Sequence, residues 1–145
     1  MTALSADARR AKYNADKAIV LDIPVAASTT IYSGALVQWN TSGYAVAAAD
    51  TASQRTAGLA LEGVVNSGSA GDKTVRVLRN VVAPFAIQAS SIAQADCGLN
   101  ATTQDDNTVA DAATTTNDIL CGLVVGMSGS QALVCVGYGY AHGNA

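Results

Sequence analysis

Short apolar runs alternate with stretches of Gly, Ser, Asn and Thr along the chain from Ala18 onward. Apolar runs bounded by such turn-forming residues are typical of β-strands. They recur about every ten residues, which is the spacing of strands in sandwiches and barrels. No amphipathic helix pattern follows residue 18. The pattern therefore predicts an all-β fold, either a small β-barrel or a jelly-roll-like β-sandwich, as a single domain over residues 18–145.

The individual strand predictions follow from the apolar runs and from the residues that interrupt them. The predicted strand regions are 18–25, 29–40, 43–50, 56–65, 73–80, 81–89 and the hairpin 119–140. Pro24 places the first strand at an edge or an end, because proline cannot donate a ladder hydrogen bond. Pro84 predicts a bulge or a bend. The Thr- and Asp-rich stretch 96–118 carries only weak strand signals.

Residues 1–17 have a different character, rich in alanine and charge. They hold four Arg or Lys residues against two Asp residues, and they show no apolar stripe at helical spacing. A helix without such a stripe has nothing to hold it against a core. We predict that residues 1–17 form a flexible, basic N-terminal arm that is extended or partly helical.

Charge is scarce in the chain as a whole. Charged residues make up 13% of the sequence, about half of the usual ~25%. This predicts a neutral surface that copies of the chain or a partner partly cover; a polar but uncharged surface is the alternative. No basic stripe is present for nucleic-acid phosphates. The uncharged stretch 23–49 holds many polar side chains that would be costly in a bilayer. We therefore expect neither a nucleic-acid nor a membrane partner.

Residues capable of catalysis or metal ligation are few. The three cysteines, Cys97, Cys121 and Cys135, form no close pair, which argues against a disulfide framework or a zinc site and fits a reducing cytosol. Cys121 and Cys135 lie in apolar runs and are expected to be small buried hydrophobes. The only histidine, His142, lies near the C-terminus. The rest of the chain therefore has no histidine for acid–base catalysis or metal ligation. We predict no enzyme activity, no catalytic residue, no metal and no cofactor.

The carboxylates have structural interpretations as well. Asp105, Asp106 and Asp111 are close in sequence, but their stretch lacks the central Gly and the closing Glu of an EF-hand loop. We interpret it as a solvated acidic loop, with a weak cation site as the alternative. Glu62 is a lone carboxylate in TAGLALEGVV (56–65). We expect it to face solvent, a basic residue such as Arg76, or a partner subunit.

The order of segments resembles that of a viral protein family. A polar, basic arm precedes IYSGALVQWNTSGYAVAAAD (31–50), then AGLALEGVV (57–65), and then a Gly-Asp turn into KTVRVLRN (73–80). This order is similar to that of the capsid decoration, or cement, proteins of tailed phages. The resemblance covers about residues 18–90, and the stretch 96–118 has no counterpart in it.

The resemblance implies a non-enzymatic β-domain that binds the outer surface of the expanded icosahedral capsid and cements adjacent capsomers against internal DNA pressure. The implied partners are the major capsid protein and further copies of this chain, as a homotrimer in preference to a homodimer. The implied location is the outer surface of the virion, after synthesis in the host cytoplasm. In this family a terminal arm becomes ordered on the shell, and residues 1–17 occupy that position here. The implied contacts are Arg9, Arg10, Lys12, Tyr13 and Lys17.

Three other functions remain open. Another virion structural subunit, such as a tail-tube, head-completion or fibre-base protein, would share the β-rich, low-charge composition. A cation- or carbohydrate-binding β-module would use the acidic stretch 96–118. A small trimeric β-enzyme would need polar side chains from neighbouring subunits to converge on a shared site.

Overall fold

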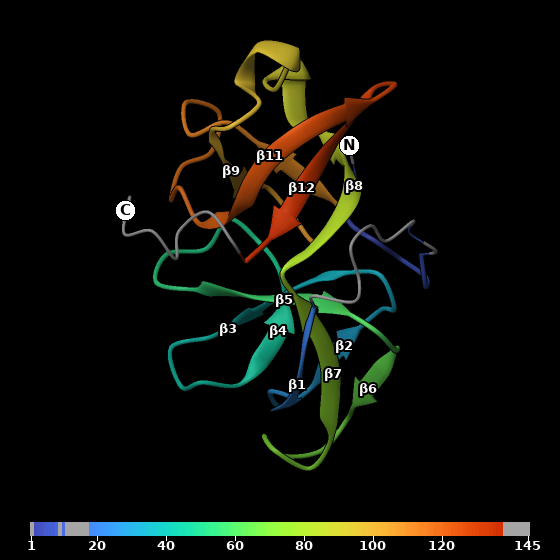
Figure 1. Ribbon diagram of the computed structural model, residues 1–145. Coiled ribbons are helices and arrows are strands. Elements are labelled where there is room, and N and C mark those ends of the chain that lie inside the picture. The colour runs from blue at the N-terminus through green and yellow to red at the C-terminus, as the bar shows by residue number, and fades with distance from the viewer. Residues whose placement is uncertain (1, 9, 11–17, 138–145) are drawn as a thin grey trace.

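The computed structural model describes residues 2–8, 10 and 18–137, and the all-β prediction is confirmed (Figure 1). Strands make up 49% of the structure and helices 5%. The strands are β1 (Ile19–Pro24), β2 (Thr29–Ile31), β3 (Leu36–Trp39), β4 (Ala45–Ala47), β5 (Arg55–Ala60), β6 (Val64–Asn66), β7 (Thr74–Arg79), β8 (Val81–Ile87), β9 (Asn100–Thr103), β10 (Thr108–Ala110), β11 (Leu120–Ser128) and β12 (Gln131–Val136). Two short 3-10 helices, η2 (Gln88–Ser90) and η3 (Gln94–Asp96), connect β8 to β9.

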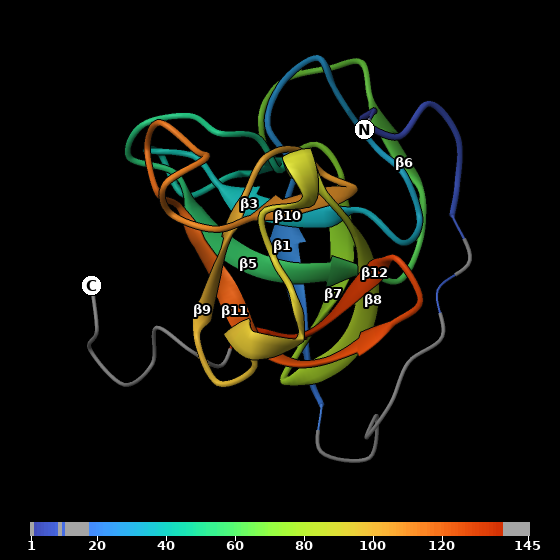
Figure 2. The ribbon, with the colours of Figure 1, turned by 90° about the horizontal axis from the view of Figure 1, so that it is seen from above.

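The strands form two units that pack against each other. A five-stranded sheet in the order β1-β7-β5-β3-β4 forms the lower unit of Figure 1, together with the two-stranded sheet β2-β6. A closed barrel in the order β10-β8-β12-β11-β9 forms the upper unit. Seen from above, the barrel strands lie in front of the sheet (Figure 2). The structure therefore combines a small barrel with a sandwich-like packing of the open sheet.

The five-stranded sheet has a hydrophobic core on each face. Leu36, Leu59 and Leu78 point from one face into the core of the barrel. Val37 and Val77 point from the other face into a second core, which the strand β2 completes. Successive side chains of a strand point to opposite faces of the sheet. Neighbouring residues in β3 and in β7 therefore serve different cores.

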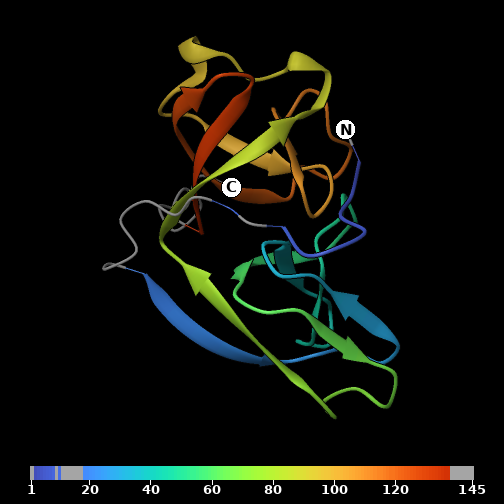
Figure 3. The ribbon, with the colours of Figure 1, turned by 90° about the vertical axis from the view of Figure 1, so that its right-hand side faces the viewer.

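Asn80 connects the two units. β7 ends just before it and β8 begins just after it, and Asn80 itself has a positive φ of 58°, which Asn tolerates better than most residues. Figure 3 shows β7 running through the lower unit and β8 turning into the upper one. Of the predicted bulge or bend at Pro84, the bulge is absent, because Pro84 lies inside β8 in unbroken register opposite Leu133 of β12. The chain passes from one unit to the other at Asn80.

The Thr- and Asp-rich stretch contributes to the barrel. It supplies β9 and β10, and the side chains of Thr102, Thr103 and Thr108 are fully buried. The hydroxyl of Thr102 donates to the carbonyl of Ala110 (3.0 Å), so this polar side chain is hydrogen-bonded inside the barrel. The prediction of a solvated acidic loop is wrong for Asp106, which is buried.

The C-terminal hairpin is confirmed, with β11 and β12 paired up to Ser128 opposite Gln131. The prediction for Cys121 is also confirmed, since its side chain is fully buried. Cys135 is only half-buried, because it lies on the less covered face of β12. In the described part of the chain, the positions of the strands agree with the prediction better than the burial of individual side chains does.

Candidate functional site

The described N-terminal residues lie along the boundary between the sheet and the barrel (Figure 3). The amide of Ala8 donates to the carbonyl of Ser33 (2.7 Å), and the carboxylate of Asp7 accepts from the amide of Ser33 (2.8 Å). On the barrel side, the amide of Leu4 donates to Oδ1 of Asp106 (2.8 Å). This segment therefore connects the β2–β3 loop of the sheet with the β9–β10 loop of the barrel.

The guanidinium of Arg10 contacts both units. It donates to the carbonyl of Gly34, to the carbonyl of Pro84 (2.8 Å) and to Oδ1 of Asn107. Its central carbon lies 4.6 Å from the centre of the Phe85 ring, which is a cation–π contact. Burial lowers the pKa of Arg10, and the carboxylates of the β9–β10 loop oppose that shift. The guanidinium stays charged, because its ordinary pKa lies far above neutral.

Gly34 allows the N-terminal segment to approach the body closely. Its φ is +84°, a conformation that side chains with a Cβ rarely adopt. A Cβ at this position would lie 2.2 Å from the carbonyl oxygen of Ala8, closer than real side chains come. Glycine is therefore required here for its backbone conformation and for the space that Ala8 occupies.

Asp106 is the buried carboxyl of this site. Its Oδ1 accepts the Leu4 hydrogen bond, and its backbone carbonyl accepts a hydrogen bond from the amide of Leu36 (2.9 Å). Burial raises the pKa of Asp106; the hydrogen bond from Leu4 and the charge of Arg10 lower it in part. Asp106, which lies in the β9–β10 loop of the barrel, thus accepts hydrogen bonds from both the N-terminal segment and the central sheet.

The sequence-predicted contact residues fall into two groups. Arg10 binds the body of its own chain, through the contacts described above. The other four lie outside the described residues: Arg9, Lys12, Tyr13 and Lys17. The structure therefore differs from the predicted flexible arm over residues 2–8 and 10, which make specific contacts with the body. Sequence reasoning missed these contacts because their partners are remote in the chain, and only the glycine at position 34 carried a local signal.

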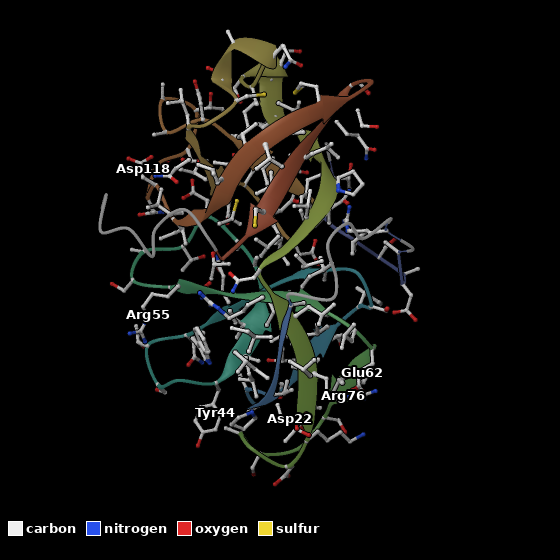
Figure 4. The ribbon with its side chains drawn as sticks, in the orientation of Figure 1. Asp22, Tyr44, Arg55, Glu62, Arg76 and Asp118 are labelled. Carbon is white, nitrogen blue, oxygen red and sulfur yellow. The ribbon has the colours of Figure 1, made fainter. Side chains whose placement is uncertain are left out.

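Glu62 and Arg76 form a surface ion pair on the sheet. Nε of Arg76 lies 2.8 Å from Oε1 of Glu62, and the two side chains are 58% and 39% exposed, respectively (Figure 4). The hydrogen bond from Arg76 lowers the pKa of Glu62, and the same bond raises the pKa of Arg76. The expectation that Glu62 faces Arg76 is confirmed. Figure 4 shows Asp22 on the neighbouring strand close to this pair.

A surface hollow lies beside the strands β3 and β5. The guanidinium of Arg79 lies 5.8 Å from the centre of the Trp39 ring and donates to the carbonyls of Thr56 (2.9 Å) and Ala57 (3.0 Å). Through these hydrogen bonds, the guanidinium of Arg79 on β7 is held against the backbone of β5. The residues that line the hollow are Trp39, Gly43, Arg55, Thr56 and Arg79.

The described residues offer little for catalysis or metal binding. Among them, no three His, Cys, Asp or Glu side chains are grouped as a metal site requires. Burial raises the pKa of the Cys121 thiol to about 12, and it also raises the pKa of Cys135. Neither thiol is therefore a thiolate nucleophile at neutral pH. No helix in the described part of the chain is long and apolar enough to cross a membrane.

Comparison of the chain with protein-family models, with curated proteins and with solved structures found no match. Its function must therefore be inferred from its own residues and their contacts.

Proposed function

We propose that this chain is a non-enzymatic structural protein that binds the outer surface of an expanded tailed-phage capsid and cements adjacent capsomers. Its partner is the major capsid protein, its site of action is the outer surface of the virion, and it acts as a homo-oligomer. The proposal rests on the order of segments in the sequence and on the character of the surface.

The observation that carries the proposal is the presence of exposed large apolar side chains on both units. Ile19 and Val20 are exposed on β1 of the sheet. Leu99 and Val125 are exposed on the barrel, where the carbonyl of Leu99 accepts a hydrogen bond from Val124 (2.9 Å), so that the two side chains belong to adjacent backbone segments. Exposed apolar side chains of this kind suit contact with protein better than contact with solvent alone.

Contacts on both units suit a protein that bridges capsomers. A subunit that touches two capsomers at once gains effective concentration at its second contact, even when each contact is small. The basic residues add a further contact in this proposal. Lys12, Tyr13 and Lys17 lie in sequence between Arg10 and β1, both of which the body holds. We propose these three residues, with Arg9, as contacts to the shell.

Co-sedimentation with expanded heads that lack this protein tests the proposal. The full chain should pellet with the heads at a fixed ratio. Deleting residues 1–17 would be a poor test, because it would also remove the contacts of Leu4, Asp7 and Arg10 with the body. The triple variant Lys12→Ala, Tyr13→Ala, Lys17→Ala leaves those contacts in place and should bind more weakly.

A charge-matched control is the double variant Arg55→Ala, Lys73→Ala, which removes two exposed cations from the body. It should bind as the unmodified chain does. If the triple variant bound the heads as well as the unmodified chain does, Lys12, Tyr13 and Lys17 would not be contacts to the shell. Failure of the unmodified chain to bind the heads would overturn the decoration function itself.

A further inference from the structure

Strand β1 forms one edge of the five-stranded sheet. It pairs with β7 along its full length, from Ile19 opposite Arg79 to Pro24 opposite Thr74. Within the described residues, β1 itself has no partner strand on its other edge, and only Val25, the residue after it, bridges to Ala45 of β4. Figure 3 shows β1 at the outer side of the lower unit. The described part of the chain therefore leaves the outer side of the first half of β1 open to another strand.

A row of apolar side chains crosses the sheet and ends uncovered on β1. Leu36 faces Leu59, Leu59 faces Leu78, and Leu78 faces Val20, so the four side chains share one face of the sheet. The exposed fractions along this row are 0%, 0%, 8% and 56%. The barrel covers the first three, and the fourth remains in solvent. One more strand beside β1 would place a further side chain next to Val20 on this face of the sheet.

The edge is protected in only one of its halves. Natural sheets guard their edges with charged side chains and proline. In β1 these are Asp22 and Pro24, both in the second half of the strand. The first half holds Ile19, which is 50% exposed, Val20 and Leu21. An incoming strand would therefore meet an uncharged, β-branched surface at Ile19 and Val20.

We propose that β1 pairs with β1 of a second copy of this chain, antiparallel about a two-fold axis. Side chains that face each other across such a pair must point to the same face of the sheet. The axis therefore passes beside a single residue. Two-fold pairing is also the commonest closed symmetry of homo-oligomers.

Charge selects the register of this pair. An axis beside Val20 places Val20 opposite Val20 of the second copy, and Ile19 opposite its Leu21. An axis beside Leu21 places the carboxylate of Asp22 opposite Val20. An axis beside Asp22 places two carboxylates opposite each other, which is destabilising. An axis beside Leu21 also joins apolar side chains, Leu21 to Leu21 and Ile19 to Ile23, but on the opposite face of the sheet. The register centred on Val20 is the one that keeps Asp22 from facing Val20 and continues the leucine row into the second sheet.

The pairing gives a dimer, whereas the family resemblance implies a homotrimer in preference to a homodimer. In the register centred on Val20, only residues 19–21 of the two β1 strands face one another, with Ala18 opposite Asp22. The interface is therefore smaller than the ~800 Å² per partner of a standard stable interface. We therefore expect an equilibrium between monomer and dimer that depends on protein concentration. The inference concerns the isolated chain, so it can fail while the capsid function holds, and the reverse is also true.

Sedimentation velocity of the full chain, from low to high micromolar concentration, measures this equilibrium. The weight-average mass should rise from monomer to dimer. Val20→Lys places two like charges at the axis and should weaken the dimer by about tenfold or more. The matched control is Val65→Lys on β6, where the side chain is equally exposed (57%) and lies away from the edge; it should dimerise as the unmodified chain does.

Cysteine cross-linking tests the register directly. In a background with Cys97→Ser and Cys135→Ser, Val20→Cys should form a disulfide-linked dimer on mild oxidation, since facing residues of antiparallel strands approach to about 4.5–5.5 Å. Val65→Cys and Asp22→Cys should form no disulfide-linked dimer. A monomer at every concentration, association that Val20→Lys leaves unchanged, or cross-linking at Asp22→Cys but not at Val20→Cys would each overturn the proposal.

Discussion

Arg10 covers the ring of Phe85, with its guanidinium carbon 4.6 Å from the ring centre. Phe85 is fully buried in the core of the barrel, and Arg10 belongs to a segment that the sequence predicted to be free. The same guanidinium donates to Gly34 of the sheet side and to Pro84 of the barrel side. One cation of the N-terminal segment thus stabilises the contact between the two units.

Replacement of Arg10 should destabilise the fold. Arg10→Ala leaves the carbonyls of Gly34 and Pro84 without their donor, and we expect a loss of about 2 kcal/mol in the free energy of unfolding, since a hydrogen bond to a charged group contributes about 1.5–3 kcal/mol. Arg10→Lys keeps the charge but not the fork of donors, so it should recover only part of this loss. Urea unfolding measures both. Arg55→Ala, at an exposed cation, is the control and should stay within about 0.5 kcal/mol; equal effects at the two positions would contradict the structural role of Arg10.

The chain holds a matched pair of glycines that isolates the contact with Ala8. Gly34 and Gly43 share a φ of +84°, but a Cβ at Gly34 would clash with the Ala8 carbonyl, whereas a Cβ at Gly43 would meet nothing within 4 Å. Gly43→Ala should cost roughly 1–2 kcal/mol for its left-handed backbone alone. Gly34→Ala should cost about 1–3 kcal/mol more, because the N-terminal segment must move.

Deletion of residues 1–8 provides the control for this comparison. It removes Ala8 and should make the two glycine substitutions equally destabilising in thermal or urea unfolding. An excess cost of Gly34→Ala that survives the deletion would show that the docked segment is not its cause.

Asp106 should give the stability a specific pH dependence. Its folded-state pKa is raised, chiefly by burial, above the ordinary value of about 3.9. The folded state therefore binds the proton more tightly than the unfolded state, and the contribution of Asp106 to stability decreases as pH rises through that value. Asp106→Asn keeps an acceptor for the Leu4 amide and does not titrate. The free energy of unfolding of the unmodified chain, minus that of Asp106→Asn, should fall from acidic to neutral pH; a flat or rising difference would contradict the buried carboxyl.

The ion pair between Glu62 and Arg76 should contribute little to stability. Both side chains are exposed, and solvent screens such pairs. We expect Glu62→Gln to leave the urea midpoint at neutral pH nearly unchanged. Because Arg76 lowers the pKa of Glu62, the small contribution that exists is present above the ordinary Glu pKa and is lost as pH falls through the lowered value. A large loss of stability at neutral pH would mean that the pair has a further partner.

The sequence by itself determined the all-β class and the positions of most strands, because both follow from local alternation of apolar and turn-forming residues. It also predicted the hairpin of β11 and β12, and it named Arg76 as one of three possible neighbours of Glu62. The latter was accessible because Glu62 and Arg76 lie on short strand-like segments joined by a single Gly- and Ser-rich turn. Each of these features depends on residues that are close in the chain.

Only the tertiary structure decided where the chain leaves the sheet, which polar residues enter the barrel, and where Arg10 lies. Pro84 has the stronger local signal for an interrupted strand, yet the barrel pairs it with Leu133, and the chain leaves the sheet at Asn80. Asp106 is acidic, yet it is buried, because Leu4 supplies a hydrogen bond from the other end of the sequence. Such positions depend on the free energy of contacts between remote residues, and no local pattern encodes which remote residues will meet.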